Sequence, residues 1–344
     1  MEFKRDYTLA VVIPCWNCEP YIRETLECLL KQSFSDWKAF LVDDGCTDGT
    51  AAIVKEYTKI DSRFYFESRN REPKGAQTCR NIGFDLTEGA EFVVFFDADD
   101  VIAPYCFEQR VKYIQSHPQL DFAVFPAKAF KHRVFDETNL VYGMRFIDND
   151  LQAMLNWNLP MIVCTNIYRR HALVNYDLRW DEKLLSLQDS DFNIQAIIKG
   201  MRYEYANASP DYFYRRIDNG ISKKIRTKLH YDSHIYMLGK TLNSVASFSP
   251  DYGFYLRNHV LLFMNMMRDY PSYLKSVSQL SWVRKDLLFH LKIMLLVLLK
   301  FKGKTRLFKK EIQYSRQMTS MWVEFMKTKA ESLRMGGFDG IYSN

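Results

Sequence analysis

The sequence predicts an α/β fold in which helices flank a mainly parallel sheet, followed by a helical C-terminal extension. Three observations lead to this prediction. The first half of the chain alternates short apolar runs, rich in Val, Ile and Phe, with segments whose apolar residues recur at helical spacing. Acidic or turn-forming residues follow several of the apolar runs. From about Lys228 onward the pattern is helical, with few strand signals.

The first elements are two strands and two helices in alternation. Residues 9–13 form an apolar run that predicts a strand, which Pro14 stops. Residues 21–31 follow with Ile and Leu at helical spacing. Residues 40–42 predict a short strand, and the helix at 50–58 begins after Thr and Asp residues that suit a helix N-terminus. This order is typical of a parallel sheet with helical crossovers.

The alternation continues to about residue 125. The expected elements are a strand at 64–66, a helix at 75–84, a strand at 92–96, a helix at 104–116 and a strand at 122–125. Five consecutive apolar residues at 92–96 indicate a fully buried strand. Ligands of open α/β sheets bind beyond the carboxyl ends of the strands, so the polar residues that follow these strands are candidates for a site.

The buried strand at 92–96 is followed at once by Asp97-Ala98-Asp99-Asp100. Carboxylates crowded this closely repel one another, and a hard divalent cation such as Mg²⁺ or Mn²⁺ relieves that repulsion. Such a cation is commonly shared with substrate phosphates, which favours a metal-assisted reaction on a phosphorylated or nucleotide-linked donor. The structural alternative is a solvated loop at the end of a strand.

Length and composition indicate a globular protein of one large or two modest domains. The chain has 344 residues, of which 47% are hydrophobic. We place the domain boundary between residues 1–225 and 226–344. The charged start without an apolar stretch predicts no secretory signal. Seven cysteines, all in the first half, form no convincing disulfide framework, so we expect a cytoplasmic protein.

The two halves of the chain carry opposite charge. Residues 1–225 have a net charge of −5 and residues 226–344 a net charge of +11. The apolar run 293–299 is too short to span a bilayer. Clustered cations follow this run: Lys300, Lys302, Lys304, Arg306, Lys309 and Lys310. This pattern favours peripheral contact with an anionic membrane at the inner face of the plasma membrane, and the alternative is a helix packed on its own domain with a solvated basic edge.

Nucleic acid is not an expected partner, because the basic half contains no recognisable nucleic-acid-binding module.

Five motifs occur in order along the first half of the chain. They are Val12-Ile13-Pro14-Cys15-Trp16-Asn17, the run from Leu41 to Thr50 around Asp43-Asp44-Gly45, the run from Lys74 to Gly83, Asp97-Ala98-Asp99-Asp100, and Leu187-Gln188-Asp189-Ser190-Asp191-Phe192. Together they resemble the family 2 glycosyltransferases over roughly residues 7–225. The resemblance implies the Rossmann-like GT-A fold. It also implies transfer of a sugar from a nucleotide donor, usually a UDP-sugar, with inversion at the anomeric carbon.

The resemblance also implies a donor-binding site. The matching positions are Pro14, Trp16, Asn17, Asp43, Asp44, Gly75, Arg80, Asp97, Ala98 and Arg215. Trp16 stands where the family has an aromatic residue that stacks on uracil, and the alternative is a wedge between loop and core. Asp44 and Asp43 resemble the carboxylates that bind the uracil edge, and the alternative for both is turn chemistry. Arg80 resembles an arginine near the nucleotide, and the alternative is a helix-surface cation.

The metal site is implied by the same resemblance. Asp99 resembles the direct ligand of Mn²⁺ or Mg²⁺, and Asp97 resembles the residue that contacts the ribose or a metal-bound water. Asp100 is expected to orient the loop. The metal would bridge the diphosphate and neutralise charge as the nucleoside diphosphate leaves.

An inverting displacement also needs a base for the acceptor hydroxyl. The family has an Asp there, within a Glu-Asp pair near the start of a helix. In this chain the pair reads Gln188-Asp189, so we expect Asp189 to be the base and note Gln188 as a departure. Asp191 is the second candidate. Both could instead be carboxylates favoured by a helix N-terminus.

A later segment, residues 211–222, resembles the family's Tyr-Arg…Ser-x-Ser segment. The resemblance implies that Arg215 reaches the donor diphosphate and that the segment closes as a lid. Ile217 lies near the position where some relatives have a histidine metal ligand, and Asp218 is the candidate to replace it. The Gln-x-x-Arg-Trp motif of processive polysaccharide synthases is absent, which favours the addition of one sugar or a short series.

The sequence thus predicts a metal-dependent, inverting hexosyl- or N-acetylhexosaminyltransferase. Its expected acceptor is a growing cell-surface glycan of the polysaccharide, capsule or lipopolysaccharide type, free or on a lipid carrier. The first alternative is a non-catalytic scaffold that binds sugar nucleotides in a glycan-assembly complex. The second is a sugar-nucleotide pyrophosphorylase, whose Gly-rich loop after the first strand is missing here. The sequence specifies neither the donor sugar, nor the acceptor, nor the oligomeric state.

Overall fold

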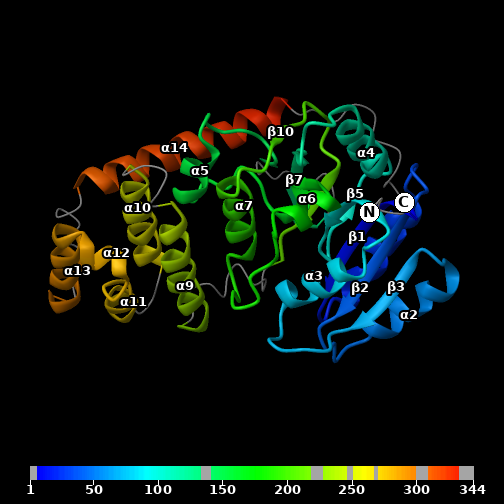
Figure 1. Cartoon of the computed structure of the whole chain (residues 1–344), viewed down its shortest axis with the longest axis horizontal. Coiled ribbons are helices and arrows are strands. Elements are labelled where there is room, and N and C mark those ends of the chain that lie inside the picture. The colour runs from blue at the N-terminus through cyan, green and yellow to red at the C-terminus, as the bar shows by residue number, and fades with distance from the viewer. Residues whose placement is uncertain are drawn as a thin grey trace.

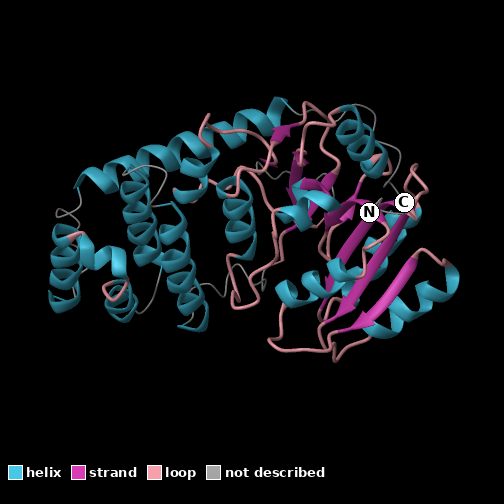
Figure 2. Ribbon diagram, in the orientation of Figure 1, coloured by secondary structure: helices cyan, strands magenta, loops and turns pink. Residues whose placement is uncertain are grey.

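The structure of the protein is a computed structural model that describes residues 6–132, 141–217, 228–245, 251–266, 270–299 and 309–332. Strands gather at one end of the molecule, and the helices of residues 228–299 lie at the other (Figures 1 and 2). Each end has a hydrophobic core of its own.

The larger core surrounds a seven-stranded sheet. Its strands are β1 (Tyr7–Cys15), β2 (Trp37–Asp43), β3 (Phe64–Ser68), β4 (Ala90–Phe95), β6 (Phe122–Val124), β9 (Asn166–Arg169) and β10 (Tyr203–Tyr205). Their order across the sheet is β10-β6-β9-β4-β1-β2-β3. The pairs β1–β2, β1–β4, β2–β3 and β6–β10 are parallel, and β9 is antiparallel to β4 and β6. The sheet is therefore mainly parallel, as predicted.

A second sheet of four strands lies beside the first. It contains β5 (Val101–Ile102), β7 (Ala127–Phe130), β8 (Val141–Tyr142) and β11 (Tyr212–Arg215), in the order β5-β11-β7-β8. The strand β11 is parallel to β7 and antiparallel to β5. Because β5 follows the acidic loop directly, this pairing brings β11 next to that loop.

Helices separate the strands of the first half. They are α1 (Glu19–Leu30), α2 (Thr50–Ile60), α3 (Ala76–Asp85), α4 (Cys106–Ser116), α5 (Asp150–Leu155), α6 (Arg170–Asn175) and α7 (Gln188–Ile198), with a 3₁₀ helix, η1 (Val163–Thr165). Their apolar residues recur at helical spacing and are buried, as Ile22, Leu26 and Leu29 are in α1.

The second half is helical. Its elements are α9 (Lys228–Val245), α10 (Asp251–Met266), α11 (Tyr270–Val277), α12 (Ser281–Lys285), α13 (Leu287–Leu299) and α14 (Lys309–Ser332). Their core also takes in Leu151 and Met154 of α5 and Ile194 of α7, so the helical region packs onto the half that contains the sheets. The predicted domain boundary after residue 225 lies outside the described residues.

The long helix α14 connects the two ends of the molecule. It runs from the neighbourhood of α13 back over α10 and α5 (Figure 1). Tyr314 packs against Phe254 of α10 and accepts a hydrogen bond from Gln152 of α5 at 2.9 Å. Further along, Trp322 stacks edge-on against Phe146, in the loop after β8. The helix therefore braces the helical region against the sheet region.

One detail of the first strand differs from the prediction. Pro14 does not stop β1, because the strand continues to Cys15 and Pro14 pairs in register with Val42 of β2. The pairing of β1 with β4 already ends at Val12, opposite Phe95. The missing N–H of Pro14 therefore removes no hydrogen bond to β4.

Two further observations concern the chain as a whole. All seven cysteines are free thiols, in agreement with the absence of a disulfide framework in the sequence. Within the described ranges, no helix has the length and apolar character needed to cross a membrane.

Candidate active site

The polar segments singled out by the sequence meet at the carboxyl edge of the parallel strands. Cys15 at the end of β1 lies opposite Asp43 at the end of β2. On the other side of β1, the backbone N–H of Phe96, just after β4, donates to the carbonyl of Val12 at 3.0 Å. The loops after β1, β2 and β4 therefore leave the sheet side by side, where ligands of open sheets bind.

The loop after β1 presents an aromatic ring to solvent. Trp16 is 45% exposed, and the Lys74 ammonium lies 4.9 Å from its ring centroid. Asn17 adopts a left-handed conformation with φ 48°. Its side-chain oxygen accepts a hydrogen bond from the backbone N–H of Thr47 at 2.8 Å. The ring therefore lies at the surface beside Lys74, whereas a wedge against the core would be buried.

The two aspartates after β2 have different surroundings. Asp43 accepts the backbone N–H of Cys46 at 2.9 Å, which is turn chemistry. Asp44 is buried and accepts two hydrogen bonds at Oδ1, from Arg69 Nε at 2.6 Å and from the backbone N–H of Gly75 at 3.1 Å. Arg69 is not among the site residues predicted from the sequence.

Gly75 occupies a backbone conformation that requires glycine. Its φ is 143°, and a Cβ at this position would lie 2.4 Å from Oε1 of Gln77. The residue directly precedes α3, so it sets the start of the helix that carries Arg80.

Arg80 is a buried link between two segments of the site, not a cation on a helix surface. Only 4% of it is exposed. Its guanidinium donates to Asp97 Oδ1 at 2.7 Å and to Gln188 Oε1 at 3.0 Å. The Gln188 amide in turn donates to Gln77 Oε1 at 2.7 Å. Arg80 therefore joins the acidic loop after β4 to the residue that precedes Asp189.

The acidic loop is held by β11. Asp100 accepts at both carboxylate oxygens, from the Tyr212 hydroxyl at 2.7 Å and from the backbone N–H of Arg215 at 2.6 Å. The same Tyr212 oxygen accepts the backbone N–H of Asp97 at 3.1 Å. Both oxygens of the Asp100 carboxylate are therefore engaged within the protein. This is consistent with the expectation that Asp100 orients the loop.

Arg215 and Ala98 hold the loop through its backbone. Arg215 donates from Nε to the carbonyl of Asp99 at 2.7 Å, and its other end pairs with Glu24 of α1. The carbonyl of Ala98 accepts from the Thr25 hydroxyl at 3.1 Å. Ala98 itself is buried. Arg215 therefore lies at the acidic loop, and its hydrogen bonds go to protein atoms.

The surroundings of Asp99 disfavour a negative charge on its carboxylate. Burial and the neighbouring Asp97 raise its pKa to about 7. Within the described residues, no group of three or more His, Cys, Asp or Glu side chains is arranged to hold a metal by itself. Mg²⁺ is usually bound through one or two carboxylates together with substrate phosphates and water. Asp97 and Asp99 fit that mode of binding, in which the donor completes the coordination.

Asp189 lies in the first turn of α7 and faces the same cluster. Its Oδ2 accepts the backbone N–H of Val163 in η1 at 3.1 Å. Burial raises its pKa, the nearby Arg80 lowers it, and Asp97 raises it further. The carboxylate therefore shares an electrostatic environment with the predicted donor-binding residues.

Asp191 points toward the helical region instead. Its carboxylate forms an ion pair with Lys240 of α9 at 2.7 Å, and Lys240 also pairs with Asp181 at 2.8 Å. Burial raises the pKa of Asp191, and Lys240 opposes that effect. Asp191 thus ties α7 to α9, while Asp189 faces Arg80 and Asp97.

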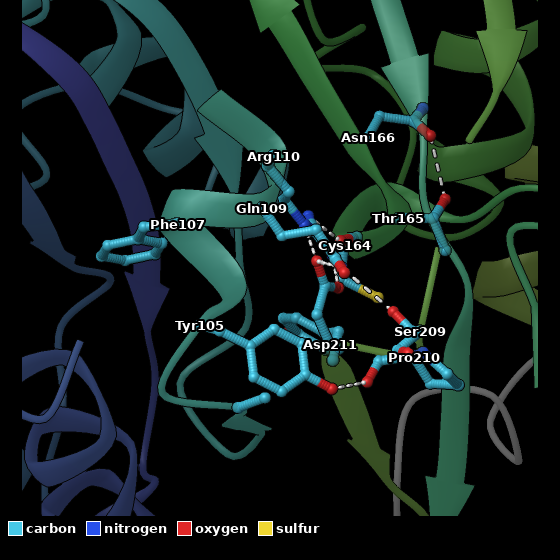
Figure 3. Close-up of polar contacts among 12 residues, drawn as sticks. Tyr105, Phe107, Gln109, Arg110, Cys164, Thr165, Asn166, Ser209, Pro210 and Asp211 are labelled. Atoms are coloured by element: carbon cyan, nitrogen blue, oxygen red, sulfur yellow. Dashed lines mark hydrogen bonds and ion pairs between the residues drawn. The ribbon is translucent and has the colours of Figure 1, made fainter. Parts of the chain in front are cut away.

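A buried arginine on α4 supports both sides of the site (Figure 3). Arg110 donates to Asp211, the residue before β11, from Nη2 at 2.6 Å and from Nε at 2.9 Å. Its Nη1 donates to the carbonyl of Cys164 in η1 at 2.8 Å. Arg110 is not among the site residues predicted from the sequence. Its position between Phe107 and Val111, on the buried face of α4, is nevertheless a sign that it is buried.

The remaining part of the predicted lid is described only up to residue 217. Ile217 is half-buried and brings no metal ligand. Asp218, the proposed replacement for a histidine ligand, lies outside the described residues, as does the rest of the segment to residue 222.

Comparisons with known proteins give the family of the domain that contains these residues. The model for glycosyl transferase family 2 matches residues 10–176. The glycosyltransferase EpsJ of Bacillus subtilis is 26% identical over 251 residues, covering 71% of this chain and 70% of EpsJ. The poly(ribitol-phosphate) beta-N-acetylglucosaminyltransferase TarS of Staphylococcus aureus is 29% identical over 278 residues, covering 72% of this chain and 46% of TarS. The chain thus spans about half of TarS.

A solved structure confirms the fold. The crystal structure of S. aureus TarS 1-349 in complex with UDP-GlcNAc has a TM-score of 0.56 at 20% identity, and the match covers 97% of this chain and 95% of that one. The mainly parallel sheet, its flanking helices and the helical C-terminal region all agree with the predicted architecture. The domain at residues 10–176 therefore belongs to glycosyl transferase family 2, and the chain has the GT-A fold.

Proposed function

We propose that this protein is a metal-dependent, inverting glycosyltransferase that moves a hexosyl or N-acetylhexosaminyl group from a UDP-sugar to a hydroxyl of a growing cell-surface glycan. One observation carries the proposal. Arg80 connects Asp97, beside the metal-binding candidate Asp99, to the residue before the candidate base Asp189. The candidate metal ligands and the candidate base thus lie around the buried guanidinium of Arg80.

The donor assignment rests on the loops after β1 and β2. The exposed ring of Trp16 offers a face on which a uracil can stack. Asp44 lies in the adjacent loop, where its backbone N–H donates to the carbonyl of Cys15 at 2.9 Å, and its carboxylate can accept the imide N–H of uracil. The solved TarS structure with UDP-GlcNAc supports a UDP-sugar as the donor class.

The chemistry assigned to the residues is a single displacement. Asp189 accepts the proton of the acceptor hydroxyl while that oxygen forms its bond to the anomeric carbon. The bond from this carbon to the diphosphate breaks on the opposite face, and its electron pair leaves with the nucleoside diphosphate. A bound Mn²⁺ or Mg²⁺ would neutralise the charge of the leaving diphosphate, with Asp99 and Asp97 as the residues that hold it.

The acceptor class is inferred from relatives. TarS is described as a poly(ribitol-phosphate) beta-N-acetylglucosaminyltransferase, and GgaA of Bacillus subtilis, 26% identical over 283 residues, as a minor teichoic acid biosynthesis protein. We propose a surface glycan of this kind, free or lipid-linked, as the acceptor.

A donor screen tests the proposal. The purified protein is incubated with UDP-, GDP- and dTDP-sugars, with Mn²⁺, with Mg²⁺ or with a chelator, and both binding and slow donor hydrolysis are measured. We expect one UDP-sugar to be selected, only when a metal is present. Selection of a GDP-sugar, or equal turnover with the chelator, would contradict the donor or the metal assignment. The anomeric configuration of the product, read by NMR, tests inversion.

The scaffold alternative remains because of Gln188. The family's acidic residue is replaced here by an amide that bonds to Arg80 and Gln77, so no neighbouring acid assists Asp189. Metal-dependent binding of a UDP-sugar without hydrolysis or transfer to any acceptor tested would favour the scaffold.

A further inference from the structure

The helix α13 exposes leucines at the end of the molecule opposite the sheets. Leu287, Leu288 and Leu291 are 66%, 65% and 56% exposed, and Leu295 is 39% exposed. On the other side of the same helix, Phe289 and Ile293 are 2% and 0% exposed in the second core. The helix is therefore apolar on both faces, and only one of them is covered by the described part of the chain.

The surroundings of these leucines are cationic. Arg284 and Lys285 of α12, directly before α13, are exposed, and so is Lys275 on α11, which packs against α13. Asp286 is the only acidic residue between positions 270 and 299. Its carboxylate pairs with Arg257 of α10 at 2.7 Å, which offsets its charge. Arg284 and Lys285 thus form a cationic rim at the N-terminal end of the leucine face.

We propose that this face, formed by Leu287, Leu288, Leu291 and Leu295 with the cations Arg284 and Lys285, binds the surface of an anionic lipid bilayer. Exposed leucines gain free energy by entering the boundary between headgroups and acyl chains, and nearby cations are attracted to anionic headgroups. The helix lies on the bilayer, since its length does not allow it to cross.

The charge and the leucines together select a lipid surface over other partners. A soluble anionic polymer would attract the cations, but it offers no apolar phase for four leucines. A second copy of the chain, packed face to face around a two-fold axis, would bring the two cationic rims together, and like charges in contact disfavour such a pair. The proposal goes beyond the transfer reaction, because no residue of the donor site takes part in it.

Vesicle flotation tests the proposal with the full chain and without any substrate. Vesicles of phosphatidylcholine alone are compared with vesicles that also contain phosphatidylglycerol, at low and at raised salt. We expect the protein to float with the anionic vesicles at low salt, and to float at least ten-fold less with neutral vesicles or at raised salt. Equal flotation with both kinds of vesicle, or none with either, would overturn the proposal.

Two variants test the contributions of the leucines and of the cations to vesicle binding separately. Leu287→Ser/Leu288→Ser/Leu291→Ser and Arg284→Glu/Lys285→Glu should each abolish flotation while the circular dichroism spectrum and donor binding stay unchanged. The matched controls change exposed residues elsewhere: Ile60→Ser/Val174→Ser/Val323→Ser and Lys31→Glu/Lys327→Glu. Flotation of the leucine variant at the wild-type level contradicts the proposal. So does a wild-type dimer that the leucine variant converts to a monomer without any flotation.

Discussion

Arg110 and Asp211 form an ion pair in which neither side chain is exposed to solvent. The guanidinium approaches both carboxylate oxygens, at 2.6 and 2.9 Å, and its remaining nitrogen donates to the carbonyl of Cys164. Asp211 starts the segment that carries Tyr212 and Arg215 to the acidic loop. Cys164 follows Val163, which donates to Asp189. One buried arginine thus joins the segment that contacts the acidic loop to the segment that contacts the candidate base.

The first prediction concerns this pair. Asp211→Asn should lower the free energy of unfolding by about 3–5 kcal/mol, because it leaves the Arg110 charge buried without its counter-charge. Urea denaturation followed by circular dichroism measures the change. Arg23→Gln is the control, since Arg23 and Glu56 form a pair that is about half exposed and should leave stability unchanged. Equal stability of wild type and Asp211→Asn would show that the pair does not hold the two segments.

The second prediction separates the two carboxylates of α7. Asp189→Asn should lower the transfer rate by about 10²–10⁴-fold with little effect on donor binding, because it removes the proton acceptor and not a diphosphate contact. Asp191→Asn breaks the ion pair with Lys240, so it should mainly lower stability. Single-turnover rates and nucleotide titrations of both variants are the measurements. A fully active Asp189→Asn together with an inactive, folded Asp191→Asn would exchange the two assignments.

The third prediction follows from the raised pKa of Asp189. A general base works when ionised, so the transfer rate should fall as the pH drops through the pKa of this carboxyl. Burial raises that pKa above its ordinary value, so the fall should lie at higher pH than for an exposed aspartate. The pH profile of kcat, recorded at saturating donor, locates this fall. A profile that stays flat down to the pKa of an exposed carboxyl would remove Asp189 from the role of base.

The fourth prediction concerns the nucleobase. Trp16→Ala should weaken UDP binding roughly 5- to 150-fold, the equivalent of about 1–3 kcal/mol for stacking of a base on an aromatic ring. Trp16→Tyr keeps an aromatic face and should retain most of the affinity. Because Trp16 is exposed, neither substitution should change the thermal midpoint. Isothermal titration with UDP gives the affinities, and equal affinity of Trp16→Ala and wild type would rule out stacking.

The sequence predicted the part of the fold in which local patterns determine structure. Continuous apolar runs marked β1 and β4 because both strands are buried on both faces of a parallel sheet. The acidic residues at the ends of β2 and β4 indicated the candidate site. The second sheet was not predicted. Its strands β5 and β8 have two residues each, too few for any periodicity, and they exist through their pairing with β11 and β7.

The residues that hold the site in place through hydrogen bonds and ion pairs were not predicted, for a related reason. Arg69 looks like an ordinary surface cation in the sequence. The apolar neighbours of Arg110 indicate burial but not its partner, and only the fold brings the two arginines to Asp44 and Asp211. Asp189 and Asp191 are equally plausible carboxylates at the start of a helix. They differ in the partners that other elements bring to them, Arg80 for one and Lys240 for the other.

A pair of buried histidines leads to the last prediction. His234 of α9 stacks on His259 of α10 with 5.0 Å between ring centroids, and on Phe263 at 3.8 Å. Neither ring nitrogen of His234 has a hydrogen-bond partner within the described residues, and the pKa of His234 lies well below its ordinary value because burial disfavours the charged form. Burial likewise lowers the pKa of His259 to about 4, although its Nδ1 lies 3.0 Å from the carbonyl of Leu155.

Mild acid should therefore destabilise the helical region. Below the ordinary histidine pKa of about 6.5 the unfolded chain binds protons that the folded chain excludes, so stability falls as the pH drops from there toward about 4. For each histidine, the free energy of unfolding falls by at most about 1.4 kcal/mol per pH unit. Urea denaturation at several pH values measures this change in the free energy of unfolding.

His234→Phe keeps an aromatic ring in the stack but removes one titrating group, so its free energy of unfolding should fall less steeply with decreasing pH than that of wild type. His171→Phe, on α6 outside this core, is the control and should leave most of the slope in place. Identical slopes for wild type and His234→Phe would show that His234 is not the group whose protonation opposes folding.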